Sequence, residues 1–366
     1  MRPTAFDRYR LLEALAPVLG FLFSLVILLI IVIAVGESPE KAAGAIYKYA
    51  LSSTPKLATI VSQAIPLFLA GLAVALAFQS GVFNIGVEGQ YFIGGFLAAL
   101  AGIHLSLPAP LHVAAVVLAG MLGGALWALI PALLKVTKGT HEVITTIMFN
   151  NIGLALVNWL VNQPFSGLKG TSNLEPQTAK IAPSAFFHKL NFLFRGLGLD
   201  VPEYIYLDYS LVVAILFGLL CWLLLFRHRY GFELRAVGVS AEVARYAGVN
   251  VNKVGLGAFL ASGALAGLVG LQEICAIRGF YTYELASGLG FDGIAIALIG
   301  KNTPLGVLFA SLLFSFLKQA GYGMQMYTSI PNSVIYVITG LMILIIVVSN
   351  EVMGRWLNRL RKKEAR

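Results

Sequence analysis

Residues 227–253 read RHRYGFELRAVGVSAEVARYAGVNVNK, a polar stretch between long apolar runs. The stretch holds five of the 26 lysines and arginines of the chain. Its flanks, at about 208–226 and 254–275, are apolar enough to cross a bilayer as helices. A short charged segment between two such spans is the kind of element with which a membrane protein contacts a soluble partner. We therefore expect an all-α integral membrane protein that works as one part of a larger assembly.

The composition of the whole chain also predicts a membrane protein. Hydrophobic residues make up 58% and charged residues 12%, and the mean hydropathy is +0.83, whereas soluble domains carry about 25% charged residues. Helices are expected rather than barrel strands, because the apolar runs lack alternation. The net charge of +9 does not indicate nucleic-acid binding, because the basic residues gather at the ends of spans.

The apolar runs predict about ten transmembrane helices in a single transmembrane domain over 1–366. The predicted spans are 16–36, 57–78, 82–103, 110–131, 143–161, 208–226, 254–275, 290–300, 304–320 and 332–350. The eighth is too short to cross alone, so we expect a broken or extended helix there. The positive-inside rule places both termini, the segment 227–253 and the basic tail 351–366 in the cytoplasm.

The one long outer loop covers about 162–207. It mixes charged residues with aromatic ones, and its segment 184–197 is predicted to lie flat at the interface as an amphipathic helix. Such a loop serves either as a lid or as a docking surface.

A first polar motif, FNIGVEGQ, covers Phe83–Gln90. Asn84, Glu88 and Gln90 fall near the start of a predicted span, where an ionisable side chain is costly. Glu88 therefore either caps a helix end or belongs to a solute path.

A second polar motif, THEVITTIMFNNIGL, begins at Thr140. In a helix, Glu142, Thr146 and Asn150 share one face, which either borders a solute path or joins neighbouring helices. His141 and Glu142 do not complete a zinc-protease motif, because position 145 is threonine. The candidate residues for the solute path are Asn84, Glu88, Gln90, Thr146, Asn150 and Asp292, the last at the head of an apolar run.

Glycines repeat at helical spacing at 263, 267 and 270 and at 120 and 124, a pattern typical of tightly packed helices. Cys221 and Cys275 lie in apolar surroundings without metal-ligand spacing, so both are expected to be small buried residues. The sequence contains no phosphate-binding loop and no nucleophile–base pair. We expect no enzymatic activity, cofactor or metal, and any energy source is an ion gradient or another subunit.

Within the opening stretch, Ala241–Tyr246 has good helix formers, Ser240 is placed to cap a helix and Gly248 to end one. Arg235 and Arg245 are suited to pairing with acidic groups on a partner. The alternative is a surface loop whose arginines contact lipid phosphates, which accounts for the charge but not for the cap.

Four segments occur in an order that resembles a known family. They are FNIGVEGQYFIGGF (83–96), THEVITTIMFNN (140–151), LRAVGVSAEVARYAGVNV (234–251) and FDGIAIALIGKNTPLG (291–306). Together they resemble the permease subunits of bacterial ABC importers for nucleosides and simple sugars, which are related to the ribose and branched-chain amino acid permeases. The likeness runs from about 57 to 350 and is strongest to the nucleoside branch.

The resemblance implies a non-catalytic subunit of the bacterial inner membrane that forms a solute path for nucleosides. It implies three partners: a cytoplasmic ABC ATPase, a second related permease, and an extracytoplasmic substrate-binding lipoprotein. It also places the coupling helix within 234–251, with the coupling residues Arg235, Gly238, Ala241, Ala244, Arg245 and Gly248.

Alternatives remain at this point. In one alternative, the same machine carries a simple sugar or a branched-chain amino acid. A second alternative is a stand-alone secondary transporter, which needs ionisable residues deep in the spans. A third is a scaffold without transport, which does not account for the polar residues at the span ends.

Overall fold

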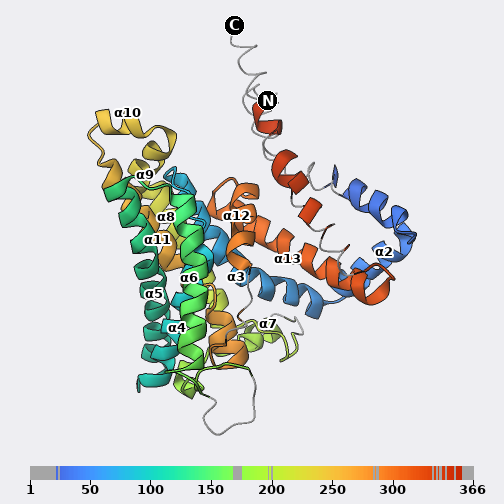
Figure 1. The fold of residues 1–366 in the computed structure, drawn as a ribbon. Helices are drawn as coiled ribbons and strands as arrows, with labels where there is room; N and C mark the ends of the chain where they lie inside the picture. Colours follow the sequence, from blue (N-terminus) through green and yellow to red (C-terminus); the bar gives the residue numbers. More distant parts are fainter. Residues whose placement is uncertain are drawn as a thin grey trace. The chain divides into compact units, whose positions relative to one another are not determined.

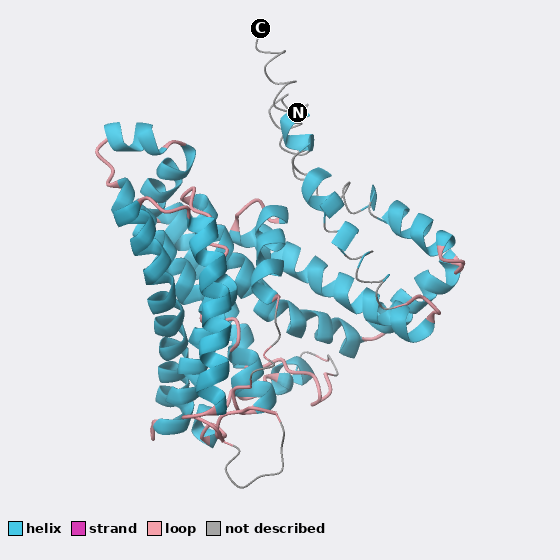
Figure 2. Cartoon of the chain, viewed as in Figure 1, coloured by secondary structure: helices cyan, strands magenta, loops and turns pink. Residues whose placement is uncertain are grey.

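A computed structural model gives the fold. It describes residues 22–356 apart from 24, 168–174, 197, 199–200, 283–284, 286–287, 332–333, 335–336, 338–339, 343 and 350–351. The regular elements of this part are helices, drawn in Figure 1 in chain order and in Figure 2 by type. The chain packs as two compact units, Met1–Ile60 with Leu313–Arg366 and Val61–Leu312. The prediction of a single domain stays a prediction.

Five helices are long and apolar enough to span a membrane: α3 (Thr54–Gln79), α5 (Ala109–Lys138), α6 (Glu142–Asn162), α8 (Tyr209–Arg227) and α13 (Pro304–Tyr327). Shorter apolar helices cover Leu25–Ala34, α11 (Val251–Ala266) and α12 (Leu289–Ile299). These elements confirm an all-helical multi-pass membrane protein. The predicted total of ten spans stays a prediction, and the start of the first predicted span and both ends of the last lie outside the described residues.

The second unit is built around α4 (Val87–His104), whose residues are buried on nearly every side. A helix that is apolar all round is a core helix, and α4 packs against α5, α6, α11 and α12. Short connections join α4 to α5 and α5 to α6 (Figure 2). The central position of α4 therefore fixes the places of the helices around it.

Glycines allow α4, α5 and α11 to lie almost backbone to backbone. A Cβ atom on Gly267, just after α11, would lie 1.9 Å from the carbonyl oxygen of Gly120 on α5. A Cβ on Gly124 would lie 2.0 Å from the carbonyl oxygen of Gly263, and one on Gly94 would lie 2.4 Å from the Cα of Gly267. The predicted tight packing of these glycines is confirmed.

Two of the predicted spans differ in extent from the helices of the structure. The predicted span 82–103 begins only at Val87, because 82–85 lie outside the helix and Asn84 bonds to side chains of the core. The predicted span 254–275 is not continuous, since α11 ends at Ala266 and turns precede the π-helix η3 (Glu273–Arg278). The short eighth span, in contrast, is confirmed as the 11-residue helix α12.

The predicted interfacial helix at 184–197 is also wrong. Only Asn191–Gly196 forms an α-helix (α7), preceded by the short 3-10 turn η2 (Pro183–Ala185). Phe187 is buried, and its backbone N–H donates to the carbonyl of Cys275. The part of the segment around Phe187 therefore packs on the protein itself, whereas Phe192 and Leu193 of α7 are exposed. An amphipathic pattern alone does not distinguish a membrane surface from a protein surface.

The first unit contains α2 (Pro39–Ile46), the π-helical segment η1 (Tyr47–Leu51), the start of α3 and most of α13. Lys48 lies over the ring of Tyr327, 4.4 Å from its centroid, and Tyr49 packs edge-on against the same ring. Ser315 donates to the carbonyl oxygen of Ile60 at 2.7 Å, which joins α13 to α3 inside this unit.

Candidate functional site

The first polar motif folds into a buried cluster at the start of α4. Asn84 is fully buried; its amide nitrogen donates to Gln90 at 2.9 Å and to Ser262 of α11 at 2.8 Å. Its oxygen accepts from the Gly86 N–H at 3.0 Å and from the Gln90 amide at 2.9 Å. Ser262 donates in turn to the carbonyl of Ala73 on α3 at 2.6 Å. Buried polar groups need such partners, and here they join α4 to α11 and α3.

The polar face of α6 completes this cluster. The amide nitrogen of Asn150 donates to the carbonyl of Ile85 at 3.0 Å, and its oxygen accepts from the Gly89 N–H at 2.9 Å. A Cβ on Gly89 would lie 2.9 Å from Phe149 O, so the two helices touch closely. Thr146 is fully buried and donates to its own helix, at the carbonyl of Glu142. This face of α6 therefore holds the loop before α4.

Glu88 caps a helix that lies 200 residues further along the chain. Its carboxylate accepts from the backbone N–H groups of Gly288 and Gly290, the latter at 2.7 Å. Both groups belong to the N-terminus of α12, where a negative charge is favourable. Gly288 has φ +96°, and a Cβ on Gly290 would lie 2.5 Å from Glu88 N. Glycine is therefore required at this contact.

The structure thus brings together five of the six predicted path residues around the first turn of α4. The sixth, Asp292, is half-buried in the first turn of α12, whose N-terminus Glu88 caps. The hydrogen bonds of the five go to backbone groups or to other polar side chains of the cluster. Their assignment to the solute path stays a prediction.

The polar stretch 227–253 forms two short helices, α9 (Arg229–Val239) and α10 (Ala241–Tyr246). Ser240 Oγ accepts from the Val243 N–H at 3.3 Å, and Gly248 closes the end with φ +83°. The predicted helix, its cap and its terminating glycine are all confirmed. Figure 1 shows α10 beyond the ends of α5, α9 and α11.

The six predicted coupling residues separate into two groups. Ala241, Arg245 and Gly248 are exposed, and Arg245 and Gly248 line a surface hollow of about 410 Å³ with Asn250 and Asn252. The other three hold the helices in place: Ala244 is buried, Gly238 packs on α3, and Arg235 lies over a ring.

The packing of the second group is close. A Cβ on Gly238 would lie 2.2 Å from the carbonyl oxygen of Gln79 at the end of α3. The Arg235 guanidinium carbon lies 5.1 Å from the centroid of Phe226, and its buried Nη1 has no hydrogen-bond partner among the described residues. The C-terminal half of α9 is thus packed against α3 and α8.

The stretch 227–253 also carries an exposed apolar surface, which was not predicted. Val239 is 89% exposed, Val243 68% and Tyr246 95%. In the sequence, these three residues are apolar positions inside an otherwise polar stretch, and this pattern could have indicated the surface. Large apolar side chains this exposed at the end of a helical bundle are typical of a surface that another protein or a membrane covers.

Tyr230 was also missed, and it links α9 to α11. Its hydroxyl donates to the carbonyl of Val254 at 3.1 Å. Burial raises the pKa of Tyr230, with a smaller contribution from the nearby Glu233 carboxylate, so the hydroxyl stays protonated and able to donate. This hydrogen bond connects α9 to the start of α11.

Comparison with known proteins adds to this geometry. The profile of the family described as "Branched-chain amino acid transport system / permease component" matches residues 56–347. The guanosine ABC transporter permease protein NupP of Bacillus subtilis is 33% identical over 97% of the chain and 99% of its own length. The glucose ABC transporter permease protein TsgB13 of Haloferax volcanii is 34% identical over 91% and 87%, respectively.

The nucleoside ABC transporter permease protein NupB of Lactococcus lactis is 31% identical over 92% of the chain and 91% of its own length. The Bacillus and Lactococcus strains each contain a second similar permease, NupQ at 30% and NupC at 28% identity. No solved structure matches the chain.

Proposed function

Because the chain belongs to the family of branched-chain amino acid transport system permease components, we propose that it is an ABC importer permease whose solute is a nucleoside. As a permease it is a non-catalytic, multi-pass membrane subunit, and ATP hydrolysis belongs to a separate ATPase chain. The three most similar relatives described above are ABC transporter permeases by name. That agreement speaks against a stand-alone secondary transporter and against a scaffold without transport.

The nucleoside assignment rests mainly on the similarity to the guanosine permease, which aligns with 97% of this chain. The nucleoside permease NupB supports the same solute class. A sugar is the second candidate, because the glucose permease TsgB13 is as similar to this chain as the guanosine permease.

Coupling of the permease to its ATPase is supported mainly by the exposed surface of α10. A cap at Ser240 and a turn at Gly248 keep this six-residue helix formed, although so short a helix is not stable alone. We propose that Val239, Val243 and Tyr246 enter a groove of the ATPase, with Arg245 against acidic groups at its edge.

Movement of the ATPase then reaches the membrane helices through two contacts. The Tyr230–Val254 hydrogen bond passes it to α11, and the close approach of Gly238 to Gln79 passes it to α3. We propose that the buried cluster around Asn84 and Glu88 borders the solute path. Because the hydrogen bonds of its polar atoms keep α4 and α12 in register, its role there is to position these helices.

We propose a second, related permease as the partner in the membrane. The paired permeases of Bacillus and Lactococcus support this arrangement. A substrate-binding lipoprotein on the outer side, an inner-membrane location and cytoplasmic termini complete the proposal. On this topology α10 faces the cytoplasm, where the ATPase is.

Coupling is tested with Val243→Asp and Arg245→Glu in the complete transporter. Each variant is expected to keep its membrane level while the amount of co-purified ATPase falls by at least about tenfold, the loss of one docking contact. Glu233→Gln, on the neighbouring helix α9, is the matched control. Normal ATPase recovery and normal uptake in both test variants would rule out docking at α10.

The solute is tested by uptake into proteoliposomes that contain the full transporter and its binding protein. ATP-dependent uptake of guanosine, competed by other nucleosides but not by glucose, is expected. Uptake of glucose that guanosine does not reduce would overturn the nucleoside assignment and leave the coupling proposal in place.

A further inference from the structure

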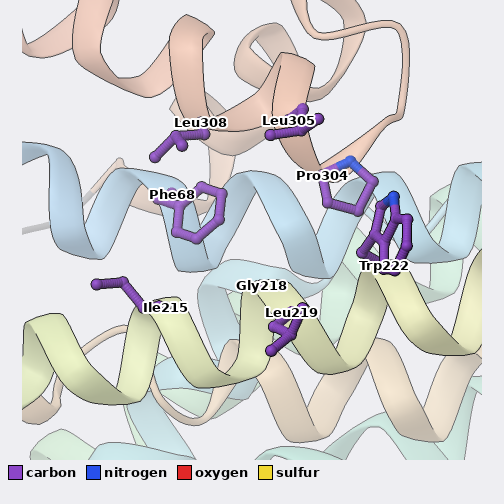
Figure 3. A pocket seen from close by; sticks show the side chains of 8 residues that line it. All are labelled: Phe68, Ile215, Gly218, Leu219, Trp222, Pro304, Leu305 and Leu308. Atoms are coloured by element: carbon purple, nitrogen blue, oxygen red, sulfur yellow. The ribbon is translucent and has the colours of Figure 1, made fainter.

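An apolar groove of about 390 Å³ opens on the surface of the second unit, between α3, α8 and the start of α13. Figure 3 shows Ile215, Leu219 and Trp222 spaced along α8, with Phe68 of α3 and Leu305 of α13 on the facing sides. Leu219 is 53% and Leu305 62% exposed. A hollow lined by carbon atoms on a membrane helix is filled either by a lipid chain or by another helix.

The shape of the groove favours a lipid chain. The distance from Ile215 to Trp222 corresponds to about 10 Å along the helix axis, whereas a spanning helix needs about 30 Å of apolar contact. At Gly218 the helices α3 and α8 pack closely, since a Cβ there would lie 2.8 Å from the ring of Phe68. This ring and the glycine both line the groove.

One end of the groove carries a positive charge. The guanidinium carbon of Arg227 lies 5.5 Å from the centroid of Trp222, which itself lines the groove. Lys301 is an exposed residue in the turn that leads to Pro304, another lining residue. Tryptophan and basic residues at a helix end mark the depth of lipid headgroups, and basic residues there attract anionic lipids.

We propose that this groove binds an anionic phospholipid. One acyl chain lies along Ile215, Leu219 and Phe68, and the phosphate lies against Arg227. The site is on the side of the membrane that carries α10, because α9 and α10 directly follow Arg227 in the chain. The bound lipid would hold the end of α8 against the start of α13.

The test uses the purified full-length chain and native mass spectrometry, with phosphatidylglycerol and phosphatidylcholine as the two probes. Arg227→Gln is expected to lower the affinity for phosphatidylglycerol about fivefold, the contribution of one basic residue at the membrane surface, and to leave phosphatidylcholine unchanged. Leu219→Trp, which fills the groove, is expected to weaken the binding of both lipids.

Two controls match these changes. Arg229→Gln removes a neighbouring exposed arginine that pairs with Glu233, and Leu220→Trp adds the same bulk on α8 at a position that does not line the groove. Test variants that bind both lipids as their controls do would overturn the proposal. A photo-reactive probe attached at Leu219→Cys that labels protein instead of lipid, in the complete transporter, would overturn it as well.

Discussion

The start of α4 and the helix α10 are both polar breaks in an apolar chain, but they use their side chains in opposite directions. Around Asn84 and Glu88 the polar atoms point inward and bond to distant helices: Asn84 donates to the Ser262 side chain of α11, and Glu88 accepts from the Gly290 N–H of α12. At α10 the polar side chains cap their own helix, and apolar ones, Val243 and Tyr246, point outward. The first break links helices of the core, and the second exposes a surface for binding. Polarity of the sequence alone therefore does not distinguish a buried polar cluster from a docking element.

The glycine contacts beside the first break predict the largest effect on the fold. Gly267→Ala places a Cβ against the carbonyl of Gly120, and overpacking against backbone is expected to cost about 3 kcal/mol of unfolding free energy. Gly255→Ala on α11 is the control, because its nearest neighbour would be 3.9 Å away. Thermal unfolding of the purified chain measures both, and equal melting temperatures would contradict the prediction.

The next largest effect is expected at Glu88. Glu88→Ala leaves the N–H groups of Gly288 and Gly290 without their acceptor, which costs about 2 kcal/mol. Glu88→Gln keeps one acceptor oxygen and should cost less. Asn151→Ala, an exposed position on α6, should stay within about 0.5 kcal/mol. The comparison is made by denaturant unfolding in detergent, and no loss in Glu88→Ala would show that α12 is held by other contacts.

A smaller and local effect is expected at the cap of α10. Ser240→Ala removes the acceptor for the Val243 N–H and should destabilise the helix by about 1 kcal/mol. Amide hydrogens of α10 should then exchange about fivefold faster, while those of α4 are unchanged. Ser240→Asp, which retains a capping oxygen, should exchange at the original rate. Faster exchange in both variants would mean that the cap does not hold the helix.

The smallest effect on the fold is expected at the exposed side chains. Tyr246→Ala should change the unfolding free energy by less than about 0.5 kcal/mol, since Tyr246 is 95% exposed. The same change should weaken binding of the ATPase in a pull-down assay. A clear drop in melting temperature would place Tyr246 among the structural residues and remove the contrast between the two regions.

Local signals allowed α10 to be predicted residue by residue, because a cap and a terminating glycine act within a few positions. The glycine pattern likewise predicted close helix packing. The partner of Glu88 could not be predicted, since Gly288 lies 200 residues away and no local pattern connects the two. The end of α11 at Ala266 was missed, because the hydropathy of 254–275 continues through turns that leave the backbone helical only in part.

The contact of α4, α5 and α11 through glycines also has a practical use. Where backbones meet without intervening side chains, no rotamer change can absorb a relative shift, so these helices can move only as one block. Two spectroscopic labels placed on exposed positions of this block, such as Leu111 and Leu126 of α5, should keep their separation through a transport cycle. The two labels give a fixed reference, so a displacement of α10 is measured as a change in the distances from them to a third label on α10.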